Sequence, residues 1–141
     1  MRIKKYVLDA NIWFSHFISK QENHLATIVL ENDLTIFYCN ELIKEIKRVA
    51  EYKRIQKYSI EASTVVNFIK LAAIHFDLIH PIKNYIPDDE NDNYIVALAL
   101  QTNSGFITSG DGHILSQKQT LEQKHSKLKI ITKAEFEKKF S

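Results

Sequence analysis

Two aspartates stand directly after segments that are predicted to be strands. Asp9 follows the apolar run at residues 6–8, and Asp111 follows the run at 105–109, with Gly110 allowing a sharp turn between them. In an open α/β sheet, ligands bind beyond the carboxyl ends of the strands, which is where these side chains would lie. An aspartate there is also common as a turn residue or helix cap. Each residue taken singly therefore leaves a functional and a structural role open.

Glu45 is a third candidate because of its place on a predicted helix. It comes three residues after Leu42 and four before Val49, so it borders the apolar face of that helix. A purely solvated glutamate is expected on the opposite face. The structural alternative is an ion pair with Arg48 at i+3, worth only about 0.2–0.5 kcal/mol. Glu41 lies one turn earlier on the same side and is the alternative residue for this role.

Asp92 is the fourth candidate and belongs to a local concentration of acids. Asp88, Asp89, Glu90 and Asp92 all fall just before an apolar helical segment. Acids near a helix N-terminus are stabilised by the helix dipole, by about 0.3–1 kcal/mol each. Four acids so close together also repel one another, which the dipole does not require. The crowding is better explained if a cation is bound there.

Carboxylates gathered in this way are typical ligands of hard divalent cations. Mg²⁺ and Mn²⁺ prefer carboxylate oxygen, and few protein ligands are needed when water and phosphate supply the remaining ones. Acids from two strand ends and two helix starts would converge over one edge of a sheet. That set suits metal-assisted hydrolysis of a phosphodiester.

Strands and helices that alternate along the chain must position these acids. The predicted strands occupy residues 6–8, 34–39, 76–81, 105–109 and 128–132. Helices are predicted over 11–31 in two pieces that meet near 19–23, from a cap at Asn40 to residue 50, from a cap at Ser59 to residue 73, over 94–100 and over 134–140. Such alternation predicts an α/β domain over residues 1–141, with a mainly parallel central sheet of about five strands.

Composition excludes several other classes of protein. The chain has 141 residues, with 19 Lys+Arg against 17 Asp+Glu, so it is neither a polycation nor an acidic tail protein. With 45% hydrophobic residues it can bury a core. Cys39 is the only cysteine, which excludes an intrachain disulfide and a thiolate zinc site. No apolar run approaches the ~20 residues of a membrane span, and no signal-peptide core is present, so a soluble cytoplasmic protein is expected.

Over nearly its whole length the chain resembles the PIN-domain nucleases, in particular the toxins of prokaryotic toxin–antitoxin systems. The segments that carry the resemblance are VLDAN at 7–11, NELIKEI at 40–46, DENDNYIVALA at 89–99, TSGD at 108–111 and IITKAEF at 130–136. They are similar to the family's opening strand with its first acid, its glutamate segment, its third and fourth acidic motifs, and its last strand and helix.

The resemblance implies a three-layer α/β/α sandwich that cleaves single-stranded RNA. By implication Asp9, Glu45, Asp92 and Asp111 hold one or two Mg²⁺ or Mn²⁺ ions. A metal in such a site lowers the pKa of a bound water, which attacks phosphorus, so no side-chain nucleophile is needed.

Further residues are assigned accessory roles on the same ground. The resemblance implies that Asn11 and Ser109 orient a ligand or water, and that Asp89 assists the metal site. Two positions depart from the family pattern: His113 stands where many relatives have another acid, and Glu90 stands where proline is common. Neither departure removes a member of the four-acid set, but His113 is expected to alter metal affinity or leave a single metal.

Other functions for a strand that ends in aspartate are less consistent with the residues. A phosphatase of the haloacid-dehalogenase type needs a second aspartate two positions on, where this chain has Asn11. A phosphate-accepting receiver domain needs an acidic neighbour, which Asp9 lacks. The remaining alternative is a PIN fold that acts as a catalytically weak binding module, through protein or RNA contacts.

Basic residues on the helix of Glu45 suggest how RNA would be held. Lys44, Lys47 and Arg48 are either a solvated face or contacts to the RNA backbone.

A protein partner is also implied, because a toxin of this kind needs an inhibitor. We expect a cognate antitoxin or a homodimer to cover part of residues 11–30. Trp13, Phe14 and Phe17 are either a core-facing apolar surface or the anchor of that interface.

Overall fold

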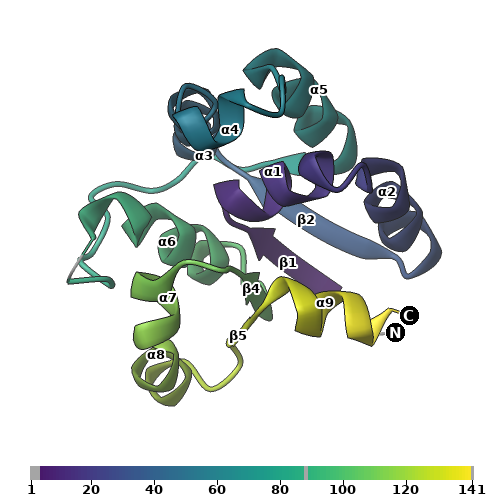
Figure 1. The fold of residues 1–141 in the computed structure, drawn as a ribbon. Helices are drawn as coiled ribbons and strands as arrows, with labels where there is room; N and C mark the ends of the chain where they lie inside the picture. The colour runs from purple at the N-terminus through teal and green to yellow at the C-terminus, as the bar shows by residue number, and fades with distance from the viewer. Residues whose placement is uncertain (1–3, 88, 141) are drawn as a thin grey trace.

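The computed structural model describes residues 4–87 and 89–140. Five strands form one sheet with parallel neighbours, in the order β3–β2–β1–β4–β5 (Figure 1). They are β1 (Lys4–Leu8), β2 (Leu34–Tyr38), β3 (Ile74–His75), β4 (Phe106–Thr108) and β5 (Lys129–Ile131). The prediction of a mainly parallel sheet of about five strands is confirmed.

Helices cover this sheet and complete the expected α/β/α arrangement. They are α1 (Ala10–Ile18), α2 (Glu22–Glu31), α3 (Asn40–Val49), α4 (Lys53–Gln56), α5 (Ala62–Ala72), α6 (Asn93–Gln101), α7 (Gly112–Ser116), α8 (Lys118–Lys124) and α9 (Lys133–Lys139). A 3₁₀ turn, η1 (Glu90–Asp92), leads into α6. Within the described ranges, no helix is both long enough and apolar enough to cross a membrane.

Strand β1 lies at the centre of the sheet and is buried on both faces. Tyr6, Val7 and Leu8 are each 0% exposed, although successive side chains of a strand point to opposite faces. A parallel strand covered by helices on both sides requires a continuous apolar run of this kind. The Tyr6 ring stacks on Phe106 of β4 at 4.6 Å between centroids and meets Phe136 of α9 edge-on at 5.4 Å.

Helix α6 is enclosed, as its uniformly apolar sequence predicts. Ile95, Val96, Leu98 and Ala99 point in several directions around the helix, and each side chain is at most 1% exposed. The helix packs against β1, β2 and β4. Because Asp92 is the N-cap residue of α6, the burial of α6 fixes that acid relative to the strand ends.

The predicted break in the helical segment 11–31 is confirmed between α1 and α2. Lys20 adopts a left-handed backbone conformation with φ 57°, which ends α1. Gln21 then donates its backbone N–H to the carbonyl of His16 at 2.7 Å.

The aromatic residues of α1 belong to the core. Trp13 is 0% exposed and Phe14 is 1% exposed, while Phe17 and Trp13 both meet Phe68 of α5 edge-on. The core-facing interpretation of this stretch is therefore right. Trp13 and Phe14 are therefore not exposed anchors for a partner, because both are buried in the chain's own core, whereas Phe17 is only partly buried.

The predicted strand at 76–81 is wrong in position. β3 is Ile74–His75, and Phe76 adds one backbone hydrogen bond to the carbonyl of Tyr38 at 2.8 Å before the chain leaves the sheet. Ile79 is 69% exposed. Pro81, which follows closely, has no N–H to donate to a ladder. The segment therefore gains little from staying in the sheet.

Helix boundaries differ from prediction in ways that have local causes. Cys39 is the N-cap of α3 and Asn40 its first residue, while α5 begins at Ala62 rather than after Ser59, which has φ 54° in a turn. Helices α4, α7 and α8 were not predicted. Each is short and has a single buried residue (Ile55, Ile114 and Leu121), so its hydrophobic periodicity is too weak to detect.

The order of the strands creates one switch point in the sheet. The chain winds outward from β1 through β2 to β3, then returns to the other side of β1 for β4 and β5. The backbone N–H of Asp9 donates to the carbonyl of Thr108 at 3.1 Å, which joins the carboxyl ends of β1 and β4. In open α/β sheets this is where ligands bind.

The aromatic contact between α9 and the sheet yields a stability prediction. Phe136→Ala removes a ring that is 0% exposed and packs on Tyr6, so we expect a loss of about 3–5 kcal/mol in the free energy of unfolding. Phe140→Ala is the matched control, because that ring is only partly buried and its loss is expected to be smaller. Urea titration measures both. Equal losses below about 1 kcal/mol would show that α9 does not pack on the sheet.

Candidate metal centre

Asp9 is held at the switch point by two hydrogen bonds to its carboxylate. It is the N-cap of α1, and its Oδ1 accepts from the backbone N–H of Ile12 at 3.0 Å. Its Oδ2 accepts from the hydroxyl of Ser109, just beyond β4. The side chain is thus both the helix cap and a residue of the strand-end edge, so neither interpretation of Asp9 displaces the other.

Ser109 links the two aspartates that follow the central strands. It is fully buried, donates its hydroxyl proton to Asp9, and accepts the backbone N–H of Asp111 at 3.0 Å. Its own backbone N–H donates to the carbonyl of Ile131 at 3.0 Å, which ties this turn to the end of β5. A single hydroxyl group therefore sets how far apart the acids after β1 and β4 can lie.

Asp111 is also a helix cap. Its Oδ1 accepts the backbone N–H groups of His113 at 2.7 Å and Ile114 at 3.3 Å, at the start of α7. Both bonds end on one oxygen, so the carboxylate is oriented by them.

Asp89 caps the turn η1 and Asp92 is its last residue, and both reach the same place from this third segment of the chain. Asp89 accepts the backbone N–H of Asn91 at 3.0 Å, and the backbone N–H of Asp92 donates to the carbonyl of Asp89 at 3.1 Å. Asp92 is only 8% exposed, and its Oδ2 is buried with no hydrogen-bond partner in the described part of the chain. Asp88 lies outside the described residues.

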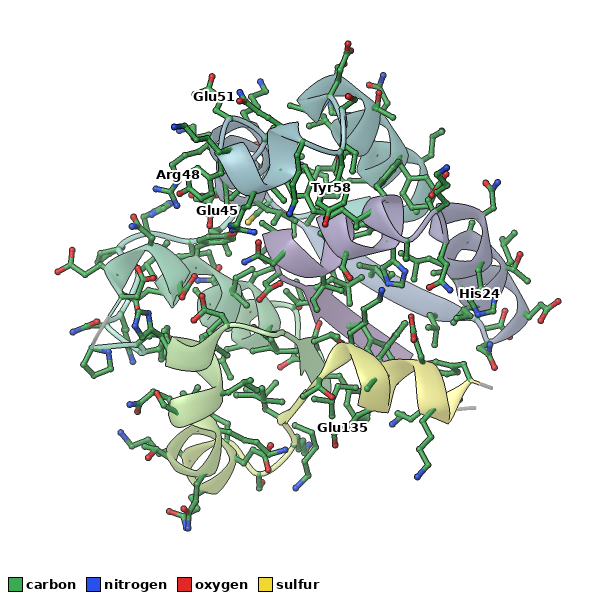
Figure 2. All side chains as sticks on the ribbon, in the orientation of Figure 1. His24, Glu45, Arg48, Glu51, Tyr58 and Glu135 are labelled. Atoms are coloured by element: carbon green, nitrogen blue, oxygen red, sulfur yellow. The ribbon has the colours of Figure 1, made fainter. Side chains whose placement is uncertain are left out.

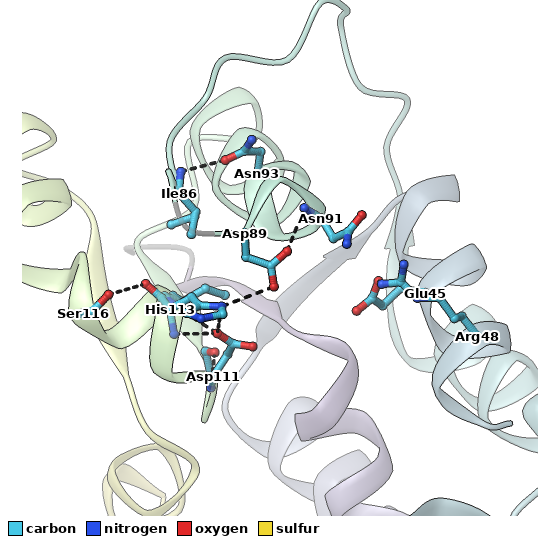
Figure 3. A network of polar contacts seen from close by, with 11 residues as sticks. Glu45, Arg48, Ile86, Asp89, Asn91, Asn93, Asp111, His113 and Ser116 are labelled. Carbon is cyan, nitrogen blue, oxygen red and sulfur yellow. Dashed lines mark hydrogen bonds and ion pairs between the residues drawn. The ribbon is translucent and has the colours of Figure 1, made fainter. Parts of the chain in front are cut away.

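These residues meet in a cluster that includes a histidine. Asp89, Asp92, Asp111 and His113 each offer one ligand atom, and these atoms all lie within 4.8 Å of one another. His113 Nδ1 is 3.4 Å from Asp89 Oδ2 and 3.9 Å from Asp111 Oδ1 (Figure 3). We call these four residues the acid–histidine cluster.

Glu45 approaches from α3 on the other side of the cluster. Figure 3 shows its carboxylate on the side of the helix that faces Asp89 and Asp111. The side chain is 17% exposed and forms an ion pair with Arg48, so the expected i+3 pair is present as well. Glu41, the alternative, instead pairs with His80 Nε2 at 3.0 Å.

Burial and repulsion from neighbouring acids raise the pKa values of Asp9, Glu45 and Asp92. Burial raises the pKa of Asp9 to about 6, with Asp111 and Glu45 adding to the shift and the bonds from Ser109 and Ile12 opposing it. Burial raises the pKa of Asp92 to about 8, reinforced by the charges of Asp111, Asp89, Glu45 and Asp9. Burial also raises the pKa of Glu45, against the lowering effect of Arg48. The four predicted acids therefore lie close enough together for their charges to raise the pKa values of Asp9, Glu45 and Asp92.

The donor set fits a divalent cation. Carboxylate oxygens are ligands for Mg²⁺ and Mn²⁺, and an imidazole is a ligand for transition ions. The buried, unpartnered Oδ2 of Asp92 is a group that a cation would satisfy, since an unpaired buried carboxylate oxygen is costly.

A hollow of about 610 Å³ opens beside Glu45, between α3 and the segment that leads into α6. Its walls include Lys44, Arg48, Asn91 and Tyr94. Lys47, on the same helix, lines a different hollow with Gln56 and Ala62. Of the three basic residues predicted to contact RNA, two therefore face the groove beside the acids.

Asn11, which was expected to orient a ligand or water, is hydrogen-bonded to a residue outside the group of acids. Its Oδ1 accepts a hydrogen bond from Arg54 Nη2 at 3.2 Å, and it lines a hollow with Arg54 and Lys133.

Two residues near the site were not singled out from the sequence. Tyr94 is 7% exposed, lines the groove, and has its pKa raised well above the ordinary value by burial and then by Glu45. Asn93 accepts the backbone N–H of Ile86 at 2.7 Å and donates to Asn84 at 3.1 Å, which braces the loop before η1. Asn91 and Asn93 alternate with acids within residues 89–93, and this pattern was the sequence signal that could have identified Asn93.

Comparison with known proteins agrees with this architecture. A family model described as PIN domain matches residues 5–113. No curated protein matches the chain. A chain of the crystal structure of VapBC2 from Rickettsia felis, bound to a DNA fragment from its promoter, is similar over 91% of this chain and 98% of its own length, with a TM-score of 0.55 and 14% sequence identity. At that identity the likeness concerns the fold alone.

The raised pKa of Asp92 predicts how stability depends on pH without metal. With a folded-state pKa of about 8 against an ordinary 3.8, the native state retains a proton that the unfolded chain has released. Stability therefore falls as pH rises toward 8, and Asp9, with a pKa of about 6, contributes at lower pH. His16 has the opposite effect below its ordinary pKa of 6.5, because burial lowers its folded pKa to about 4.

The measurement is urea unfolding in chelator at pH 7.5 and pH 8.5, an interval that lies above both the folded and the ordinary pKa of His16. We expect the free energy of unfolding to fall by on the order of 1 kcal/mol for the native sequence. We expect Asp92→Asn to be nearly flat over the same interval. A native protein as flat as that variant would show that Asp92 is not held in a field of like charges.

Proposed function

This chain belongs to the PIN domain family, and we propose that it is a metal-dependent endoribonuclease that hydrolyses phosphodiester bonds of single-stranded RNA. The observation that carries the proposal is the convergence of carboxylates at the β1/β4 switch point around Asp92, whose buried Oδ2 has no hydrogen-bond partner in the described chain. Groups held together against their own repulsion are expected at a functional site rather than a structural one.

In this proposal Asp9, Glu45, Asp92 and Asp111 are the catalytic acids that hold one or two Mg²⁺ or Mn²⁺ ions. A divalent ion bound there supplies a water of lowered pKa and neutralises charge on the phosphodiester. The chain's own hydrogen bonds orient the acids in advance: Ser109 fixes Asp9, and the start of α7 fixes Asp111. Asp89 assists as an accessory acid.

The groove beside α3 is proposed to hold the RNA strand. Lys44 and Arg48 present cations that neutralise phosphates, next to the carboxylate of Glu45. Tyr94 forms part of the wall.

We also propose that the protein is a cytoplasmic toxin with a cognate antitoxin, and that it can form a homodimer. The support is the fold-level likeness to a chain of the VapBC2 structure, which is bound to a DNA fragment from its promoter. An Arg or Lys from the antitoxin would pair with Asp9 and Asp111 and replace the charge of the metal. The covered part of residues 11–30 would have to use side chains other than Trp13 and Phe14, which are buried.

Asp92→Asn tests the nuclease proposal. The variant keeps the size of the side chain but removes a charge from the metal site, so we expect cleavage of a fluorescent single-stranded RNA with Mg²⁺ or Mn²⁺ to fall at least ~100-fold. The control is Asp33→Asn, at an exposed turn where φ is 51° and asparagine is equally well tolerated. It should cleave as the native protein does.

Growth of cells that express each variant extends the same test. The native chain and Asp33→Asn should arrest growth, Asp92→Asn should not, and coexpression of the neighbouring reading frame should relieve the arrest. A native protein that binds RNA but does not cut it with either metal would favour the binding-module alternative. Cleavage without growth arrest would remove the toxin role and leave the nuclease.

Arg48→Gln tests the groove. Because Arg48 lines the groove and Lys47 lines a different hollow, we expect Arg48→Gln to weaken RNA binding and to lower the slope of log K against log[salt] by about 1. Lys47→Gln is the matched control on the same helix and should leave that slope unchanged. Binding is measured by fluorescence anisotropy with Asp92→Asn as the background. Equal effects of the two substitutions would place the RNA elsewhere.

A further inference from the structure

We propose that His113 is itself a ligand of the divalent cation, through Nδ1, and that the site therefore selects transition ions such as Mn²⁺ over Mg²⁺. This inference rests on the metal site of the proposed function and adds a nitrogen donor to its carboxylates. It concerns which ion the chain binds and not whether RNA is the substrate.

The placement of His113 fits a shared ion better than a hydrogen bond. Its Nδ1 lies 3.4 Å from Asp89 Oδ2 and 3.9 Å from Asp111 Oδ1, both longer than the usual N–H···O distance of about 2.9–3.0 Å. Two ligands that each stand ~2.1 Å from one ion can be up to about 4.2 Å apart. Both separations fall within that limit.

The acids around His113 are already oriented by the backbone. Asp89 Oδ1 accepts from Asn91, which leaves Oδ2 as the oxygen that faces the imidazole. The backbone N–H of His113 donates to Asp111, so the histidine and the aspartate are held on one turn of α7. A histidine two positions after a capping aspartate thus has its ring directed to the same place as the carboxylates.

Asp92 provides an independent indication that a ligand belongs here. It is 92% buried, since 8% of its surface is exposed, and its Oδ2 has no hydrogen-bond partner in the part of the chain that the structure describes. One of its oxygens lies within 4.8 Å of the ligand atoms of the other three residues. A cation at the acid–histidine cluster would satisfy an oxygen that the protein leaves unpaired.

The imidazole decides which ion is favoured. Mg²⁺ is bound almost entirely by oxygen and keeps several waters. An imidazole binds Mn²⁺ more strongly than it binds Mg²⁺, and later transition ions more strongly still. His113→Asp replaces the nitrogen donor with an oxygen donor and is therefore the matched comparison within this chain.

Pulsed EPR of the protein loaded with Mn²⁺ alone tests the proposal without any measurement of activity. A coordinated imidazole gives a ¹⁴N modulation of the Mn²⁺ signal, which we expect in the native chain and not in His113→Ala or His113→Asp. His24→Ala is the control, because His24 is exposed on α2, away from Glu45 (Figure 2). It should keep the modulation.

Calorimetry with Mn²⁺ and Mg²⁺ separately gives the second readout. We expect the preference for Mn²⁺ over Mg²⁺ to fall about tenfold in His113→Asp, because the substitution removes the nitrogen donor, and changes at groups that only support a ligand already alter metal affinity by at least about that factor. Mn²⁺ binding without ¹⁴N modulation in the native chain would overturn the role of His113 and leave the nuclease proposal standing. No binding of either ion would overturn the proposed metal site as well.

Discussion

Repulsion between carboxylates is the constraint on which the rest of this structure depends. Asp9 and Asp92 are almost fully buried close to three other acids, and charged groups so placed avoid each other unless the fold holds them. The fold does so with backbone N–H groups at the starts of α1, α7 and η1, and with the hydroxyl of Ser109. Each of the bonds from a backbone N–H both forms a helix cap and fixes the direction of an acid, and the Ser109 hydroxyl adds a second bond to Asp9. Folding and the assembly of the site are therefore the same process.

The strand order explains why three distant segments meet. Because β4 returns to the free side of β1, the turns after these strands become neighbours, and α6 lies against both strands. The apolar surface of α6 is enclosed for packing reasons alone, yet its enclosure carries Asp92 to the edge of the sheet. A buried helix with an acid at its start can be positioned more firmly than a loop, since any displacement of the acid would have to move the core.

The sequence predicted the sheet, the buried helix and the meeting of acids because each has a strong local signal. Val7 and Leu8 before Asp9 are such a signal, since a short apolar run that ends in an acid marks a strand end. The short helices escaped detection for want of periodicity. Which side chains pair with one another could not be predicted from the sequence either. Nothing in the spacing tells that Ser109 bonds Asp9, 100 residues away, or that Asn11 turns toward Arg54. The position of His113, two residues after Asp111, indicates that it lies near the site, but the direction of its ring could not be predicted from the sequence.

The two ends of the described chain lie together, on the side of the sheet opposite to the acids (Figure 1). Lys4 opens β1, and its ammonium lies over the ring of Phe140, 5.6 Å from the centroid, just beyond α9. Asp9 follows the other end of the same strand, about 16 Å away at the rise of a β-strand. A short peptide could join the ends and new termini could be opened in an exposed loop, which would give a circular permutant with an unobstructed acidic edge. Affinity tags or fused reporter domains at either end would leave that edge equally accessible.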